Sequence, residues 1–186
     1  MDNNKLVKEC IKGLPAAQRQ LYDFFAEIML GVCYRYTKSI TDAEDVLQEG
    51  FVKVFRNLGQ YKFEGELGAW IRRIMVTTAI NYLKKNRHYR SELSFEDESL
   101  HPVSDDHPEV NLSAKELADM IRQLPAGYQT IFNLHAVEGF THVEIGKIMG
   151  ISEGTSRSQY MRARNLLITW INKQTNDIKE TNYAGK

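Results

Sequence analysis

The spacing of apolar and polar side chains predicts two consecutive helices near the C-terminal end of the chain. Thr141 followed by Glu144 is the pattern of a capping box, which places the start of the first helix at Thr141. Gly150 tolerates the left-handed backbone that ends many helices, and Ser152 can cap the helix that follows. Side chains of the second helix recur at intervals of three and four residues and are expected to face inward: Ser156, Tyr160, Ala163, Leu167 and Trp170. The turn between the helices is only about three residues long, as in a helix-turn-helix.

The opposite face of the second helix carries small and basic side chains. It comprises Gly154, Thr155, Ser158, Arg162 and Asn165, flanked by Arg157, Gln159 and Met161. Small and arginine side chains near a helix N-terminus suit entry into the DNA major groove, where arginine pairs with guanine. This pattern predicts a DNA-reading helix, and the alternative is a surface helical hairpin whose arginines are solvated.

A second amphipathic pattern lies between residues 41 and 58. Thr41 followed by Glu44 predicts another capping box at the start of this helix. One face is apolar and consists of Leu47, Gly50, Phe51, Val54 and Leu58. The other face carries Asp45, Gln48 and Glu49, which helical spacing brings into one patch that can meet basic residues of a partner. On pattern alone, a solvated helix face explains these three residues as well.

The segment between residues 61 and 90 combines cations with aromatic side chains. No acidic residue interrupts residues 71–90, which contain Arg72, Arg73, Lys84, Lys85, Arg87 and Arg90. The aromatic residues of the segment are Tyr61, Phe63, Trp70, Tyr82 and Tyr89. Cations beside aromatic rings predict a phosphate-binding surface suited to single-stranded or locally opened DNA. Trp70, Ile71 and Ile74 are expected to contribute to the core, and the alternative for the cations is solvation.

Charge is distributed unevenly along a chain whose formal net charge is zero. Residues 1–90 carry 15 Lys and Arg against 10 Asp and Glu, whereas residues 91–112 carry seven acidic residues, no basic residue and two of the four prolines. This acidic stretch without helical period predicts a linker. We therefore expect an all-α protein with two small helical domains at residues 10–90 and 113–172, an acidic linker at 91–112 and a polar tail at 173–186. The C-terminal domain is predicted to be the helix-turn-helix.

The composition narrows the possible chemistry. No apolar run approaches the roughly 20 residues that span a membrane, and the N-terminus lacks the apolar core of a signal peptide, so we expect no membrane insertion and a cytoplasmic location. Cys10 and Cys33 are far apart, and we expect them to be buried as small apolar residues. Neither they nor the five scattered histidines predict a metal site, a cofactor or a catalytic centre.

Three segments in a fixed order resemble the extracytoplasmic-function class of bacterial sigma factors of the sigma-70 family. DAEDVLQEGFVKVF is similar to the helix of this family that binds the polymerase clamp. FEGELGAWIRRIMVTTAINYLKK is similar to the promoter-melting segment, and LPAGYQTIFNLHAVEGFTHVEIGKIMGISEGTSRSQYMRARNLL to the domain that reads the minus-35 element. The resemblance covers roughly residues 10–172.

The resemblance implies a role for each of the surfaces described above. Polymerase binding would use Asp45, Gln48 and Glu49. Capture of the minus-10 element would use Lys62, Phe63, Trp70, Arg72, Arg73, Thr77, Asn81, Lys84, Lys85 and Arg87. Minus-35 recognition would use Thr155, Arg157, Ser158, Met161 and Arg162. By the same resemblance, the acidic linker would occupy a basic channel of polymerase.

The function implied by the resemblance is that of a sigma factor without enzymatic activity, which binds core RNA polymerase, directs it to promoter DNA and nucleates strand opening. An anti-sigma factor is a further partner common in the family. The sequence departs from the family at Thr77, where asparagine is frequent, and at Ser156, where valine is usual. One alternative is a DNA-binding regulator that recruits polymerase from outside and needs neither the basic segment 61–90 nor the patch at residues 45, 48 and 49. A recombinase or nuclease would need a catalytic constellation, which the sequence does not offer.

Overall fold

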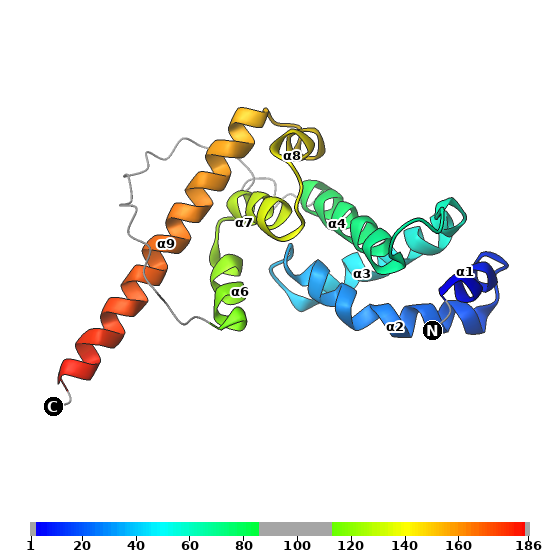
Figure 1. Cartoon of the computed structure of the whole chain (residues 1–186), viewed down its shortest axis with the longest axis horizontal. Coiled ribbons are helices and arrows are strands. Elements are labelled where there is room, and N and C mark those ends of the chain that lie inside the picture. Colours follow the sequence, from blue (N-terminus) through cyan, green and yellow to red (C-terminus); the bar gives the residue numbers. More distant parts are fainter. Residues whose placement is uncertain (1–2, 86–112, 185–186) are drawn as a thin grey trace. The chain divides into compact units, whose positions relative to one another are not determined.

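The computed structural model describes residues 3–85 and 113–184, and residues 175–184 by their helical backbone alone. All regular elements in these ranges are helices, which form two compact units, Met1–Arg87 and His88–Lys186 (Figure 1). The predicted all-α class with two small helical domains is therefore confirmed. The predicted acidic linker, residues 91–112, lies outside the described residues.

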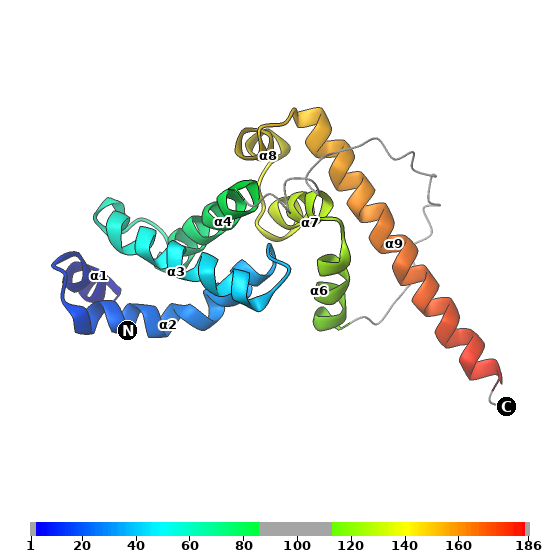
Figure 2. The ribbon, with the colours of Figure 1, turned by 180° about the vertical axis from the view of Figure 1, so that it is seen from behind.

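The N-terminal unit is built around a long helix that contacts three others. Its elements are α1 (Asn3–Ile11), α2 (Pro15–Tyr34), α3 (Ile40–Asn57), the short 3₁₀ helix η1 (Leu58–Gln60) and α4 (Leu67–Lys85). Helix α2 packs against α1, α3 and α4, and α3 also packs against α4, which Figure 2 shows from behind. The five residues predicted for the apolar face of α3 and its end are all buried, as are Leu21 of α2 and Ile71 and Met75 of α4, the two helices that α3 packs against.

Helix α1 adds an element before the predicted start of this domain at residue 10. Leu6, Val7 and Cys10 are buried where α1 packs on α2. Both cysteines are buried and free, as predicted. Burial raises the pKa of the Cys33 thiol to about 12. These cysteines therefore act as small core residues.

The prediction of a capping box at Thr41 and Glu44 is wrong. Helix α3 begins at Ile40, and Ser39 is its N-cap, with an extended backbone and a side-chain Oγ that accepts the Asp42 backbone N–H at 3.1 Å. The Thr37 hydroxyl lies 3.2 Å from the Ser39 carbonyl oxygen and 3.4 Å from the Cys33 carbonyl oxygen of α2, and can donate its proton to either. Thr41 consequently lies inside the first helical turn, where its hydroxyl is not in a capping position.

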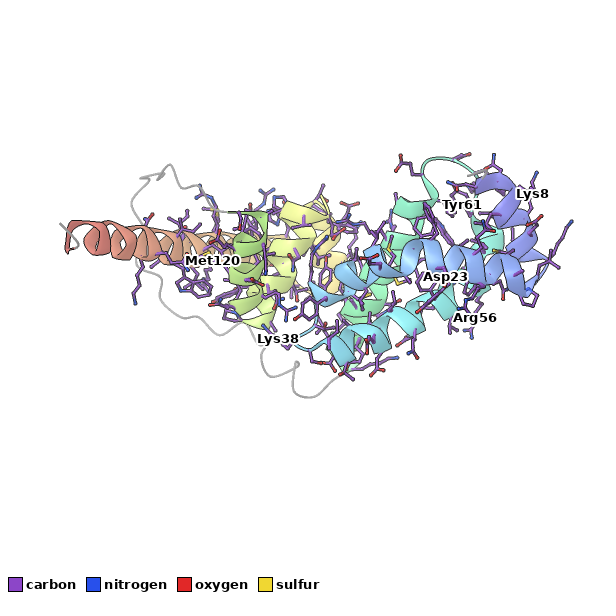
Figure 3. All side chains as sticks on the ribbon, turned by 90° about the horizontal axis from the view of Figure 1, so that it is seen from below. Lys8, Asp23, Lys38, Arg56, Tyr61 and Met120 are labelled. Atoms are coloured by element: carbon purple, nitrogen blue, oxygen red, sulfur yellow. The ribbon has the colours of Figure 1, made fainter. Side chains whose placement is uncertain are left out.

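The C-terminal unit contains α6 (Ala114–Gln123), α7 (Ala126–Phe132), the π-helical turn η2 (Asn133–Val137), α8 (His142–Met149) and α9 (Glu153–Ala184). Helices α7 and α8 both pack against α9. The buried centre of one cluster consists of Met120 (labelled in Figure 3), Leu124, Ala163 and Leu167. Trp170 is half-buried and packs against this cluster, so Ala163, Leu167 and Trp170 face inward as predicted.

Helix α9 continues beyond residue 172 to Ala184, so most of the expected polar tail is helical. Between residues 155 and 184 the sequence contains neither glycine nor proline. No local signal therefore ends the helix where the apolar pattern fades.

We predict that Ser39→Ala lowers the free energy of unfolding by about 1 kcal/mol, because the Asp42 backbone N–H loses its capping acceptor. Thr41→Ala is the matched control and should change this free energy by less than about 0.5 kcal/mol. Urea unfolding of the full chain, followed by circular dichroism, measures both. Equal losses in the two variants would show that Ser39 is not the cap.

Candidate nucleic-acid and partner interfaces

The acidic patch of α3, defined as Asp45, Gln48 and Glu49, is only partly free to meet a partner. Asp45 and Gln48 are exposed, and Glu49 is half-buried. The Lys53 ammonium lies 2.7 Å from a Glu49 carboxylate oxygen and donates to Thr78 Oγ1 on α4 at 3.2 Å. Glu49 is thus tied to the α3–α4 seam, while Asp45 and Gln48 offer their polar groups to solvent.

A groove beside this patch was not predicted from the sequence. It has a volume of about 490 Å³ and lies between α2 and α3. Its lining consists of Tyr22, Ala26, Glu27, Leu30, Glu44, Leu47 and Gln48. Gln48 belongs to both the patch and the groove, and Glu27 and Glu44 add two carboxylates. The sequence could not reveal this groove because Glu27 reaches it only through the packing of α2 on α3.

One stripe of α4 carries most of the residues predicted for minus-10 DNA. Arg73, Thr77 and Asn81 are exposed at intervals of four residues, and Trp70 and Lys84 extend the same stripe as half-buried side chains. Arg72 is half-buried and Lys85 exposed on its flanks, and α4 contains no acidic residue. Arg87, the remaining predicted residue of this set, lies outside the described residues.

The loop before α4 and the first turn of α4 form an aromatic cluster, which we define as Tyr61, Phe63 and Trp70. The Tyr61 ring, labelled in Figure 3, is 7% exposed and lies 5.2 Å from the Phe63 ring and 5.6 Å from the Trp70 ring. Tyr61 also donates its hydroxyl to the Gly65 carbonyl at 2.8 Å. Trp70, expected in the core, is only half-buried, whereas Ile71 is fully buried. Tyr61 is therefore the anchor of the loop, a role that the sequence did not indicate.

Phe63 is presented to solvent in an unusual backbone conformation. Its φ is +59°, in the left-handed region that few non-glycine residues adopt, and its side chain is 40% exposed. Lys62 beside it is also exposed. Such strain is found preferentially at binding sites, where the surrounding contacts maintain it. The loop thus holds one aromatic face and one cation at the end of the α4 stripe.

Helices α8 and α9 form the predicted helix-turn-helix. Thr141 and Glu144 make both hydrogen bonds of the capping box, Gly150 has φ +76°, and Ser152 Oγ accepts the Thr155 backbone N–H at 2.9 Å. These three local predictions are confirmed. Gly146 was missed: a Cβ there would lie 2.8 Å from the Ile151 carbonyl oxygen, so only glycine lets α8 approach the turn this closely.

The outer face of α9 presents most of the residues predicted to meet minus-35 DNA. Arg157, Ser158 and Met161 are exposed, and Thr155 and Arg162 are half-buried. The Arg157 guanidinium pairs with the Glu153 carboxylate one turn earlier, at 2.6 Å. Both side chains are largely exposed, so this pair orients the guanidinium more than it stabilises the fold.

Gln159 was predicted to flank the outer face, but it is buried. It lies three residues after Ser156 and four before Ala163, both of which are buried. Helical spacing therefore assigns Gln159 to the inner face.

None of the helices in residues 3–85 and 113–184 is long and apolar enough to cross a membrane. In the same ranges, no group of three or more His, Cys, Asp or Glu side chains is arranged to hold a metal ion.

Comparison with known proteins gives matches to both units. Residues 21–89 match the family model of sigma-70 region 2, and residues 114–167 match that of sigma-70 region 4. The chain is 30% identical over 178 residues to the ECF RNA polymerase sigma-E factor of Haemophilus influenzae, covering 90% of this chain and 94% of that protein. It is also 30% identical over 176 residues to the RNA polymerase sigma-H factor of Pseudomonas aeruginosa, covering 89% and 91%. Among solved structures, it is similar to the sigma factor RpoE of Bartonella quintana, determined in complex with the anti-sigma factor NepR, at 20% identity, with 80% of this chain and 92% of that chain covered and a TM-score of 0.49.

Proposed function

This chain belongs to the family of extracytoplasmic-function RNA polymerase sigma factors, and from that premise we propose how its surfaces divide the steps of transcription initiation. A sigma factor is a transcription initiation factor that directs RNA polymerase to specific promoters. The observation that carries the division is the pairing of α3 with α4: exposed acidic and amide side chains lie on one helix, and cations with aromatic rings lie on the other. A regulator that only recruits polymerase would need α8 and α9 but neither of these surfaces.

The acidic patch and the adjoining groove are the proposed site for core polymerase. Asp45 and Gln48 are exposed, and Glu27 and Glu44 add negative charge at the groove. Leu30 and Leu47 provide apolar lining that can receive an aliphatic side chain. The site therefore suits a basic, amphipathic helical segment of the partner.

The α4 stripe and the aromatic cluster are the proposed site for the opened minus-10 strand. Arg73 and Lys85 can neutralise phosphates, and the exposed face of Phe63 can stack on an unpaired base. Opening about ten base steps costs on the order of 14 kcal/mol, whereas one stacked base returns only about 1–3 kcal/mol. Core polymerase must therefore supply most of the stabilisation of the open strand.

Helix α9 is the proposed reader of the minus-35 element. Arg157 stands one turn from the start of the helix, where a recognition helix contacts base edges, and Ser158 and Met161 are exposed beside it. We place the protein in the cytoplasm, where core polymerase and promoter DNA are found. Family membership also makes an anti-sigma factor a proposed partner.

Asp45→Lys should weaken binding to core polymerase more than tenfold, because it reverses the charge of an exposed side chain of the acidic patch. Asp119→Lys on α6 makes the same charge change in the other unit and should leave the affinity unchanged. Fluorescence titration of labelled full-length protein with core enzyme measures both variants. Wild-type affinity of Asp45→Lys would contradict the assignment of this surface.

Phe63→Asn should slow open-complex formation about tenfold, because the base loses its stacking partner. Asparagine tolerates a positive φ, so the melting temperature should not fall by more than a few degrees. Phe24→Asn, at another exposed aromatic residue of the same unit, is the control and should open DNA at the wild-type rate. Permanganate footprinting on a promoter selected with wild-type holoenzyme follows the opening. Normal opening by Phe63→Asn would remove Phe63 from the site.

Arg157→Ala should reduce the preference of the holoenzyme for an intact over a scrambled minus-35 element by about tenfold or more, as expected for loss of a bidentate base contact. Binding to core polymerase should stay unchanged. Lys115→Ala removes one positive charge from the same unit and should preserve the preference. Transcription from paired templates measures the ratio, and an unchanged ratio would show that Arg157 does not read the DNA.

A further inference from the structure

Two histidines join the three elements that meet at the helix-turn-helix. His135 of η2 and His142, the first residue of α8, stack with ring centroids 4.2 Å apart and an angle of 24° between the rings. The Tyr160 ring of α9 meets the His135 ring edge-on at 4.6 Å. This histidine stack therefore contacts both helices of the DNA-binding motif.

Hydrogen bonds hold both imidazoles in place. His135 Nδ1 lies 2.9 Å from the Phe140 carbonyl oxygen, so this nitrogen carries a proton and donates it. His142 Nδ1 lies 2.9 Å from Ser156 Oγ, and Ser156 is fully buried. The second bond directly joins the start of α8 to the first turn of α9.

The position of Ser156 gives this bond a geometric consequence for α9. Ser156 immediately precedes Arg157 in the sequence, and each residue turns a helix by about 100°. Holding the Ser156 hydroxyl against His142 therefore sets the rotation of α9 about its own axis, and with it the direction of Arg157 and Ser158. The buried Ala163 and Leu167 constrain the same angle further along α9, and the His142–Ser156 bond acts at the first turn, beside Arg157.

Burial and the surrounding charges lower the pKa of His142 and so favour its neutral imidazole. The groups that face it are His135 from η2 and Glu153, Arg157 and Tyr160 from α9. Burial lowers the pKa of His142, the neighbouring His135 and Arg157 lower it further, and Glu153 opposes them. Glu144, on the same helix, is bound to Thr141. A neutral ring can stack on His135 without repulsion between like charges.

We propose that His142 and Ser156 are positioning residues for minus-35 recognition: their hydrogen bond sets the angle at which α9 presents Arg157 to DNA. This inference rests on the proposed role of α9 as the DNA reader. It concerns a contact between two protein side chains, neither of which needs to touch the DNA.

The test uses full-length variants assembled with core polymerase and the paired templates with intact and scrambled minus-35 elements. Ser156→Ala should lower the intact-to-scrambled ratio about threefold to tenfold, the range of one hydrogen bond. Its melting temperature should fall by only a few degrees, because the helix preference of alanine offsets part of the lost hydrogen bond. His142→Ala removes the same bond and also the ring stack with His135, so it should lower the ratio at least as much. The double variant should lose no more than His142→Ala, because the bond is already absent there.

Two comparison variants separate positioning from general stability. His142→Asn retains a side-chain polar atom near the position of Nδ1 and should restore most of the ratio. Thr169→Ala removes another hydroxyl from the same helix, one that donates to the Asn165 carbonyl, and should leave the ratio unchanged.

The results distinguish failure of this inference from failure of the proposed function. A wild-type ratio for Ser156→Ala, or a ratio that falls only in parallel with the melting temperature, would overturn the positioning role. If Arg157→Ala lowers the ratio while Ser156→Ala does not, α9 reads DNA but this bond does not orient it. If neither changes the ratio, the assignment of α9 as the reader falls.

Discussion

The close packing of α3 against α4 is the constraint on which the N-terminal unit depends. Gly50 of α3 leaves room for the side chain of Met75 of α4, whose sulfur occupies the place that a Cβ would take. Along the same seam, Lys53 joins Glu49 to Thr78. The proposed polymerase and DNA surfaces therefore stand on one packed pair of helices. Polymerase must provide most of the free energy for strand opening. Because α3 and α4 are packed together, polymerase bound at α3 would hold the DNA-facing stripe of α4 in a fixed position.

The C-terminal unit depends on a different constraint: α8 and α9 must keep a fixed angle across a very short turn. Gly146 removes the side chain that would push α8 away from the turn, and Gly150 supplies the left-handed residue that reverses the chain. Neither glycine determines how α9 is rotated about its axis. The buried inner face of α9 constrains that rotation, and the proposed role of the His142–Ser156 bond is to fix it at the first turn. The glycines thus determine how closely α8 approaches the turn, and side-chain contacts determine how α9 is rotated.

Interactions that close within one helical turn could be predicted from the sequence. The Thr141–Glu144 capping box and the apolar face of α3 belong to this class, because their partners lie three or four residues apart. The same reasoning failed at the start of α3, where both Ser39 and Thr41 could serve as the N-cap. Local pattern does not rank Ser39 against Thr41, since the cap is the residue whose backbone is extended where the helix begins, and that residue is Ser39.

The sequence by itself determined the helical class, the order of the two units and the side chains available to each surface. Only the tertiary structure decided which of those side chains meet. Glu27 joined the groove next to Gln48, Tyr61 became the anchor of an aromatic loop, and His142 reached Ser156. The physical reason is that helical periodicity tells which face of a helix is buried. It carries no information about which helix covers that face, and these contacts depend on that neighbour.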